Sequence, residues 1–222
     1  MISDEATARQ LNADVEVNAI SVSQAVETRR SIKVFDPAHR MSEQEVKWLF
    51  ERAILSPTAF NIQHWRFVQV KDIALRKRIR ALAWDQAQVT DASILLVLCA
   101  DLKAWNKNPH RYWKNTPKEI QDSMVETMRQ FYGNDAQLER DEAIRSCSFA
   151  ACSLMLLAKE LGYDSCPMDG FDFAEVARLI NLPKDCEICM MLPIGKALEP
   201  PYPRSGQLLT SDVVFTDRFP DE

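Results

Sequence analysis

Residues 93–100 read SILLVLCA, and this stretch decides the fold. Seven of these eight residues are apolar, which is typical of a strand buried on both faces rather than one that alternates between core and solvent. A second stretch, from Cys186 to Leu192, also has strand length and is largely apolar. We therefore predict a sheet with these two strands at its centre.

The segments around the central strands are mostly helical in pattern. Ser42 and Glu45 form a capping box ahead of apolar residues at helical spacing, and Asp72 can cap another helix. Between these helices, residues 65–70 alternate as a strand. The other predicted helices span residues 22–30, 116–133, 135–161 and 173–180. Helices dominate over strands, so the predicted fold class is α+β, with a central sheet surrounded by helices.

Helical spacing also predicts which side chains face the core. Ala25 and Val26 are expected to point inward from the first helix, and the second half of the helix at 135–161 is apolar nearly all round, as in a buried helix. Thr116 is expected to cap the next helix, with Pro117 as its first residue. The face predicted to be buried in that helix carries Ile120, Met124, Met128 and Phe131.

The composition excludes several classes of protein. Lys and Arg number 27 against 32 Asp and Glu, a net charge of −5, which speaks against a nucleic-acid partner but leaves room for a locally basic pocket. The 5 glycines stand singly, so neither a GxGxxG nor a phosphate-binding GxxxxGK[ST] motif can be written. No stretch approaches eighteen uninterrupted apolar residues, so neither a transmembrane helix nor a membrane partner is predicted.

The cysteines and histidines do not suggest a metal or a disulfide. The 6 cysteines, with no apolar leader in residues 1–20, predict a reducing, cytoplasmic setting. Cys186 and Cys189 form a CxxC pair within a predicted strand and are interpreted as core residues, as are Cys147 and Cys152 on the long helix. Zinc would require a second ligand pair, and the three histidines, His39, His64 and His110, are isolated from one another.

Three polar segments are candidates for chemistry. Arg29, Arg30, Ser31 and Lys33 form a basic turn of the kind that binds a phosphate dianion, although by itself it could equally be a solvated turn. Residues 56–65, SPTAFNIQHW, form a polar loop that leads into a strand. Residues 166–171, CPMDGF, place Gly170 just before a helix, where backbone N–H groups can face a ligand.

These segments, in this order, resemble the nitroreductase family of FMN-dependent oxidoreductases. The resemblance rests on RRSIKVFDP (29–37), SPTAFNIQHWRF (56–67), the passage from Gln88 through DASILLVLCA (91–100), ELGYDSCPMDGF (160–171) and LPKDCEICMMLPIGKALEPPYPR (182–204). It implies a mixed central sheet in an intertwined homodimer, with one FMN at each of two interfacial sites. The implied organisation is a polar N-terminal extension (1–21), an FMN-binding domain (22–200) and a C-terminal tail (201–222) that wraps over the partner.

The resemblance also implies roles for individual residues. Lys33 is expected at the flavin pyrimidine edge, where it would stabilise the reduced anion, and Gln88 lies near the same edge. No side chain is expected to act as a catalytic nucleophile or a metal ligand. The implied phosphate-side residues are Arg29, Arg30, Ser31 and Arg204, the residues from the second subunit are Pro57, Thr58, Ala59 and Asn61, and those along one flavin face are Pro167, Met168, Asp169 and Gly170.

The chain departs from the family pattern at three places. His64 replaces the usual proline before the tryptophan, Asp85 and Gln88 stand where many relatives carry Asn and Lys, and Gly206 replaces a second C-terminal cation. Residues 102–135 correspond to a variable excursion that in relatives often covers the substrate side of the flavin. Its aromatic residues Trp105, Tyr112, Trp113 and Phe131 could equally serve ordinary packing.

The implied activity is two-electron transfer from NAD(P)H to an electron-poor small molecule, such as a nitroaromatic or a quinone, by a ping-pong route. Two alternatives stay open. A dehalogenating, enoate-reducing or flavin-destroying enzyme would keep the same FMN site, and a non-catalytic carrier or regulator would bind FMN without turnover.

Overall fold

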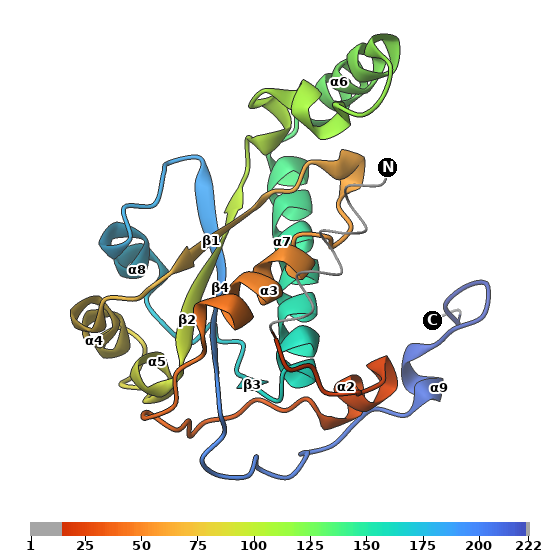
Figure 1. Cartoon of the computed structure of the whole chain (residues 1–222). Coiled ribbons are helices and arrows are strands. Elements are labelled where there is room, and N and C mark those ends of the chain that lie inside the picture. The colour runs from red at the N-terminus through yellow and green to blue at the C-terminus, as the bar shows by residue number, and fades with distance from the viewer. Residues whose placement is uncertain (1–14, 221–222) are drawn as a thin grey trace.

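Four strands form one sheet in the order β1 (Trp65–Gln69), β2 (Ile94–Asp101), β4 (Cys186–Gly195) and β3 (Asp164–Ser165). The computed structural model describes residues 15–220 (Figure 1). All neighbouring strands pair antiparallel, and a single parallel bridge between Ser31 and Ser165 lies at the β3 edge. The stretch 93–100 therefore lies at the centre of the sheet, as predicted, and every residue of β2 is buried.

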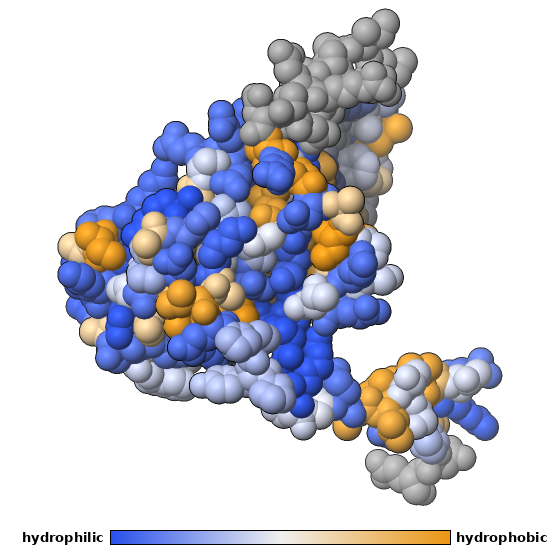
Figure 2. All heavy atoms as spheres, turned by 60° about the horizontal axis from the view of Figure 1, so that its bottom comes forward, coloured by the Kyte–Doolittle hydropathy of each residue, from blue (hydrophilic) through white to orange (hydrophobic). Residues whose placement is uncertain are grey.

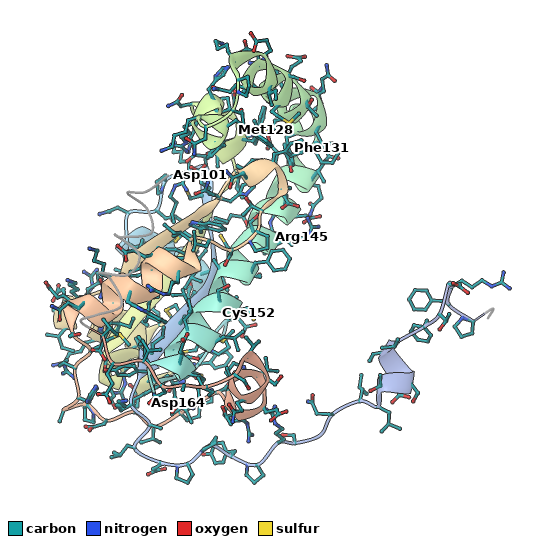
Figure 3. The ribbon with its side chains drawn as sticks, turned by 45° about the vertical axis from the view of Figure 1, so that its right-hand side comes forward. Asp101, Met128, Phe131, Arg145, Cys152 and Asp164 are labelled. Atoms are coloured by element: carbon teal, nitrogen blue, oxygen red, sulfur yellow. The ribbon has the colours of Figure 1, made fainter. Side chains whose placement is uncertain are left out.

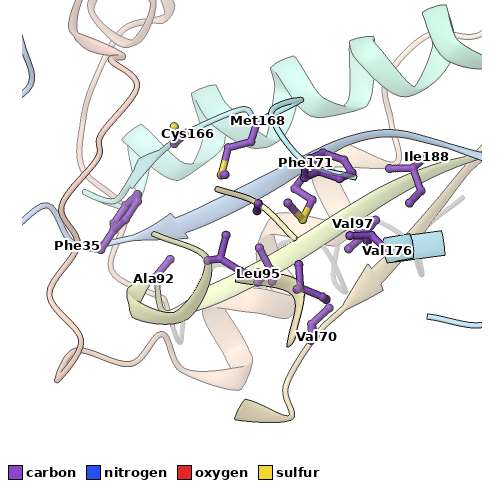
Figure 4. Close-up of a cluster of buried hydrophobic side chains, with 14 of the residues drawn as sticks. Phe35, Val70, Ala92, Leu95, Val97, Cys166, Met168, Phe171, Val176 and Ile188 are labelled. Atoms are coloured by element: carbon purple, nitrogen blue, oxygen red, sulfur yellow. The ribbon is translucent and has the colours of Figure 1, made fainter. Parts of the chain in front are cut away.

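Side chains of β2 alternate between two cores, which explains why the strand is apolar throughout. Leu95, Val97 and Cys99 belong to the core beneath α4 (Ile73–Ala81), α5 (Gln88–Asp91) and α8 (Phe173–Leu179), part of which is shown in Figure 4. Ile94, Leu96 and Leu98 pack on the opposite face against α3 (Glu43–Ala53) and α7 (Ala136–Glu160). The result is a three-layer α+β arrangement.

The predicted capping box is confirmed at the start of α3, and α2 (Val22–Thr28) begins with a second capping box. Ser42 and Glu45 satisfy each other's backbone N–H groups at 3.2 and 2.7 Å, and Ser21 and Gln24 do the same at the start of α2. The remaining helices are α6 (Lys118–Tyr132), α9 (Thr210–Val213) and three short 3₁₀ turns, η1 (Ala59–Asn61), η2 (Ala104–Asn106) and η3 (Pro109–Trp113).

Four details of the predicted helices are wrong. The first helix ends at Thr28, and Val26 is 54% exposed. The helix α6 begins after Pro117, because the Thr116 hydroxyl donates to the carbonyl oxygen of Trp113 instead of capping the helix. The helix α7 buries only part of its apolar surface. Phe149 is 47% exposed and Cys152 is also exposed, so Cys152 is not a core residue in this chain.

The buried face of α6 is rotated relative to the prediction. Val125, Met128 and Tyr132 are buried, whereas Ile120 and Phe131 are about half exposed. The rings of Phe60 and Trp105 lie about 6 Å from the Tyr132 ring, and this aromatic cluster determines which face of α6 turns inward.

The two ends of the described chain differ in their packing. Val15 is buried in the core with α7, and the backbone N–H of Asn18 donates to the Glu160 carbonyl oxygen at 2.9 Å, so the last part of the predicted N-terminal extension is packed. Residues 1–14 and 221–222 of the predicted extension and tail lie outside the described residues. Residues 201–220 are exposed throughout. Among residues 15–220, no helix has the length and apolar character needed to cross a membrane.

Two isoleucines on α4 provide a matched test of this packing. Ile79 is fully buried and Ile73 is 53% exposed. We expect Ile79→Ala to lower the free energy of unfolding by about 2–5 kcal/mol, because it leaves a cavity, and Ile73→Ala to change it by less than about 0.5 kcal/mol. Urea unfolding at one fixed protein concentration measures both variants. Equal losses would show that the core beneath α4 is packed differently.

Candidate functional site

The basic turn that follows α2 is held by two buried apolar side chains. Ile32 and Phe35 are 2% and 1% exposed, and the backbone N–H of Ile32 donates to the Ser165 carbonyl oxygen at 3.1 Å. Ser31 also pairs with Ser165 through the parallel bridge. This anchoring leaves Ser31 and Lys33 exposed beside the β3 edge of the sheet.

Residues 202–204 return to the same turn from the far end of the sequence. The Arg30 guanidinium donates to the Tyr202 carbonyl oxygen, and Arg204 Nη2 donates to the Glu27 carbonyl oxygen at 2.9 Å. Within residues 15–220, none of Arg29, Arg30, Lys33 and Arg204 forms an ion pair with a carboxylate, in contrast to Arg140, which pairs with Glu187 at 2.8 Å. Cations gathered without an acidic partner suit a bound phosphate.

The loop 166–170 supplies backbone donors beside these cations. Met168 pairs with Met191 of β4 through two hydrogen bonds of 2.9 Å, which hold the loop along the sheet. In the described part of the chain, the N–H groups of Asp169 and Gly170 donate to no other group. Gly170 has no room for a side chain, because a Cβ there would lie 2.6 Å from the Trp84 ring.

Lys33 and Gln88 come together at this loop. Lys33 Nζ lies 3.6 Å from Cys166 Sγ, and the side chain of Gln88, which is 3% exposed, is close enough to act on the pKa of the Cys166 thiol. Gln86 links Gln88 to the Gly170 carbonyl oxygen through hydrogen bonds of 3.0 and 3.2 Å. Asp85, by contrast, is exposed and its carboxylate lies 2.7 Å from Arg80 Nε.

The loop that follows Pro57 lies near the opposite end of α7. Thr58 Oγ1 accepts from the Gln63 backbone N–H at 3.2 Å, and the Ala59 N–H reaches Glu142 on α7 at 3.4 Å. Asn61 Nδ2 donates to the Tyr112 carbonyl oxygen at 2.9 Å. The loop residues Phe60, Asn61 and Gln63 have left-handed backbone angles, with φ of 52°, 57° and 54°. Such strain is concentrated at functional sites.

The two groups of candidate residues are therefore far apart in one chain. Glu142, which contacts the loop at 57–61, and Glu160, next to the β3 end of the molecule, are 18 residues apart on α7, or about 27 Å at 1.5 Å per residue. Figure 3 labels Arg145 and Cys152 on α7 and Asp164 just after it, and these three residues lie in that order from the first part of α7 toward its far end. Arg29, Arg30, Ser31, Lys33, Gln88, Pro167–Gly170 and Arg204 lie at one end, and Pro57, Thr58, Ala59 and Asn61 at the other.

The excursion at 102–135 is tied to α7 by buried polar contacts. Trp105 Nε1 donates to Glu139 Oε1 at 2.7 Å, and the Tyr112 hydroxyl donates to the Ala104 carbonyl oxygen at 3.0 Å. Trp105 is buried, so it serves packing, whereas Phe131 presents half of its surface to solvent.

One group of potential metal ligands was not expected from the sequence. Oxygen and sulfur atoms of Asp101, Asp185 and Cys186 lie within 4.8 Å of one another. Lys107 Nζ already lies 2.8 Å from Asp101 and 2.6 Å from Asp185, and Arg66 Nη2 lies 2.8 Å from Asp101, so two cations balance the two carboxylates. Cys189 is half-buried and packs against two of the hydrophobic cores, as predicted, whereas Cys186 is half-buried at the start of β4 and belongs to no core cluster of the described residues.

A family model described as "Nitroreductase family" matches residues 26–196. The chain belongs to the Nitroreductase family. Protein DrgA of Synechocystis sp. is 51% identical over 175 residues, covering 79% of this chain and 83% of DrgA. MhqN of Bacillus subtilis (strain 168), assigned as an NAD(P)H nitroreductase, is 36% identical over 177 residues, covering 77% of this chain and 86% of MhqN.

The fold of this nitroreductase-family chain is also found among solved structures. The crystal structure of an Exiguobacterium sibiricum 255-15 protein in complex with FMN superposes with a TM-score of 0.83 at 28% identity, covering 89% of this chain and 98% of that one. The predicted α+β nitroreductase fold is therefore confirmed, but the predicted mixed sheet is wrong, because the strands of residues 15–220 pair antiparallel and only the isolated Ser31–Ser165 bridge is parallel.

The sequence patterns gave no role to Trp84, Gln86 and Cys166, three residues at the loop 166–170, although Cys166 belongs to the CPMDGF segment. Trp84 packs on Gly170, Gln86 bonds to its carbonyl oxygen, and Cys166 meets Lys33. Cys166 directly precedes the predicted residue Pro167, and Trp84 precedes Asp85. Their closeness to predicted positions is the only signal that the sequence offered.

His64, whose role was open, is buried and neutral. It is 1% exposed, and burial lowers its pKa from the ordinary 6.5 to about 4. Its Nδ1 has no hydrogen-bond partner among the described residues. His64 is therefore an interior residue that leads from the 57–63 loop into β1.

This burial predicts a pH dependence of stability. The pKa of His64 is lower in the folded chain than in the unfolded chain. As the pH falls below 6.5, His64 of the unfolded chain binds a proton that the folded chain does not bind, and this lowers the free energy of unfolding. Between pH 6.5 and pH 5, His64 should account for a loss of about 2 kcal/mol, and His64→Gln should remove that part of the loss. Urea unfolding of both proteins at the two pH values measures the difference. An identical pH dependence in wild type and variant would contradict a buried, neutral His64.

Proposed function

We propose that this protein is an FMN-dependent oxidoreductase that passes two electrons from NAD(P)H to an electron-poor small molecule such as a nitroaromatic or a quinone. The observation that carries the proposal is the group of cations without carboxylate partners, Arg29, Arg30, Lys33 and Arg204, beside the free N–H groups of Asp169 and Gly170. The proposed compartment is the cytoplasm, where reducing conditions keep cysteines as thiols.

The proposed phosphate end of the site is the turn after α2. Arg29, Arg30 and Arg204 supply positive charge, and the exposed Ser31 supplies a hydroxyl donor. The turn is held by the burial of Ile32 and Phe35, so these groups need little reordering to bind a dianion. Each charge-assisted hydrogen bond of this kind contributes about 1.5–3 kcal/mol.

The proposed isoalloxazine end is the loop at 166–170 with Lys33 and Gln88. FMN, when bound, supplies the two-electron chemistry, so no nucleophilic side chain is required. The Lys33 ammonium would stabilise negative charge at the pyrimidine edge, and the N–H groups of Asp169 and Gly170 would orient the ring. Gly170 allows the close approach of the backbone, since any side chain there would collide with Trp84.

The site is proposed to be shared by two chains in a homodimer. Within one chain, the loop at 57–61 contacts α7 at Ser153, through Ser56, and at Glu142, away from the β3 edge where the basic turn lies, and this supports a site completed by a second chain. Exposed apolar residues offer a dimer surface. They include Leu55 (78%) and Phe149 (47%) on the body. On the tail, which reaches away from the body in Figure 3 and carries the orange atoms at the lower right of Figure 2, they are Leu208, Leu209, Val213, Val214, Phe215 and Phe219.

The purified protein should be yellow and contain one FMN per chain, and NADH or NADPH should bleach the flavin. Arg29→Ala should weaken FMN binding about 10- to 100-fold, because it removes a charged phosphate partner. Arg140→Ala, which removes only the ion pair with Glu187, should bind FMN as the wild type does. Titration of flavin-free protein with FMN measures the FMN affinity of the wild type and of both variants. A colourless wild type that takes up no FMN would refute the proposal, and equal affinities of the two variants would refute the role of the basic turn.

Mixing defective chains tests the shared site. A chain with Arg29→Ala and a chain with Thr58→Ala and Asn61→Ala should each bind FMN poorly, because each lacks one half of every site. After unfolding and refolding together, random pairing should restore tight binding in about a quarter of the sites, since each mixed dimer contains one intact site. Refolding each variant alone is the control. If mixing restores no binding, both halves of the site come from the same chain.

A further inference from the structure

A buried thiol lies between the two polar side chains that we place at the flavin pyrimidine edge. Cys166 is fully buried, its Sγ lies 3.6 Å from Lys33 Nζ, and the side chain of Gln88 is close enough to act on the pKa of the thiol. Lys33 and Cys166 are 133 residues apart in the sequence, so only the fold brings them together.

Both partners have a fixed backbone. The Cys166 N–H donates to the Pro193 carbonyl oxygen of β4 at 3.1 Å, and the thiol belongs to the core shown in Figure 4 together with Phe35 and Met168. Lys33 follows Ile32, which is buried and bonded to Ser165. The long, flexible lysine side chain is thus held at its tip by an acceptor that cannot move.

The chemical character of the acceptor matters for the charge of Lys33. Burial raises the pKa of the Cys166 thiol, so the group that accepts from Lys33 is neutral. A carboxylate at this position would hold the ammonium more tightly but would cancel its charge. A neutral thiol orients the ammonium and leaves its positive charge for a ligand, and the remaining two N–H groups of the ammonium stay free to donate.

We propose that Cys166 is a positioning residue that holds the Lys33 ammonium toward the pyrimidine edge of the bound flavin and thereby raises the flavin midpoint potential. This inference rests on the proposed FMN site. Cys166 itself need not touch the flavin, because it acts through the orientation of Lys33.

The test is a set of redox titrations on FMN-loaded dimers. Lys33→Met should reduce the ratio of reduced to oxidised flavin about tenfold at a given potential, equivalent to about 30 mV for a two-electron couple. Cys166→Ala should shift the ratio in the same direction by about threefold. Cys166→Ser, which keeps an acceptor, should restore most of the wild-type ratio. Cys147→Ala, at another fully buried cysteine on α7, should leave the ratio unchanged.

The double variant Lys33→Met with Cys166→Ala separates positioning from a general structural effect. If Cys166 acts through Lys33, the double variant should match Lys33→Met alone. Additive shifts, or a Cys166→Ala shift no larger than that of Cys147→Ala, would overturn the inference while leaving the proposed function intact. If Cys166→Ala does not retain FMN, Cys166→Val, which fills the buried space but accepts no hydrogen bond, takes its place with the same expectations. Failure of the wild type to bind FMN would instead overturn the proposed function and this inference with it.

Discussion

The burial of β2 on both faces is the constraint on which the rest of the structure depends. A strand with Leu95 and Val97 on one side and Leu96 and Leu98 on the other requires a helical layer against each face. The antiparallel pairing of β2 with β4 then places the end of β4 and the short β3 at one side of the sheet. The basic turn after α2 pairs with β3 at that place, so the candidate phosphate site is a direct consequence of how the central strand is covered.

The second constraint is the length of α7. A helix of 25 residues is about 37 Å long, and it carries Glu142 near one end and Glu160 at the other. The loop at 57–61 is bonded to the first end, and the basic turn lies beside the second. This separation along the helix supports the proposal that a second chain completes the site. The exposed apolar residues on α7 and on the tail are consistent with such an assembly.

The candidate site is positively charged because no carboxylate among residues 15–220 pairs with its cations. Some other cations of the described surface, such as Arg66, Lys107 and Arg140, are paired with carboxylates, and their charge is locally balanced. Arg29, Arg30, Lys33 and Arg204 contact only backbone oxygens, a thiol or solvent within residues 15–220. Neutral contacts fix the position of a cation without cancelling its charge, and this lets a chain with a net charge of −5 present a locally basic surface.

The sequence by itself determined the features that depend on neighbouring residues. The apolar run at 93–100 predicted the central strand, the Ser42 and Glu45 capping box predicted the start of α3, and RRSIKVFDP with CPMDGF predicted two segments that lie at one end of the molecule. These features follow from hydrophobic periodicity, capping and turn chemistry, which are local.

The tertiary structure decided everything that depends on which element packs against which. Periodicity placed Val26 and Cys152 in the core, but no element within residues 15–220 covers them, so both are exposed there. The buried face of α6 was decided by the rings of Phe60 and Trp105, which come from distant segments. The contact of Lys33 with Cys166, residues that are 133 apart in the sequence, could not be predicted either. Each of these features depends on how the sheet and α7 pack together, and no single stretch of sequence encodes that packing.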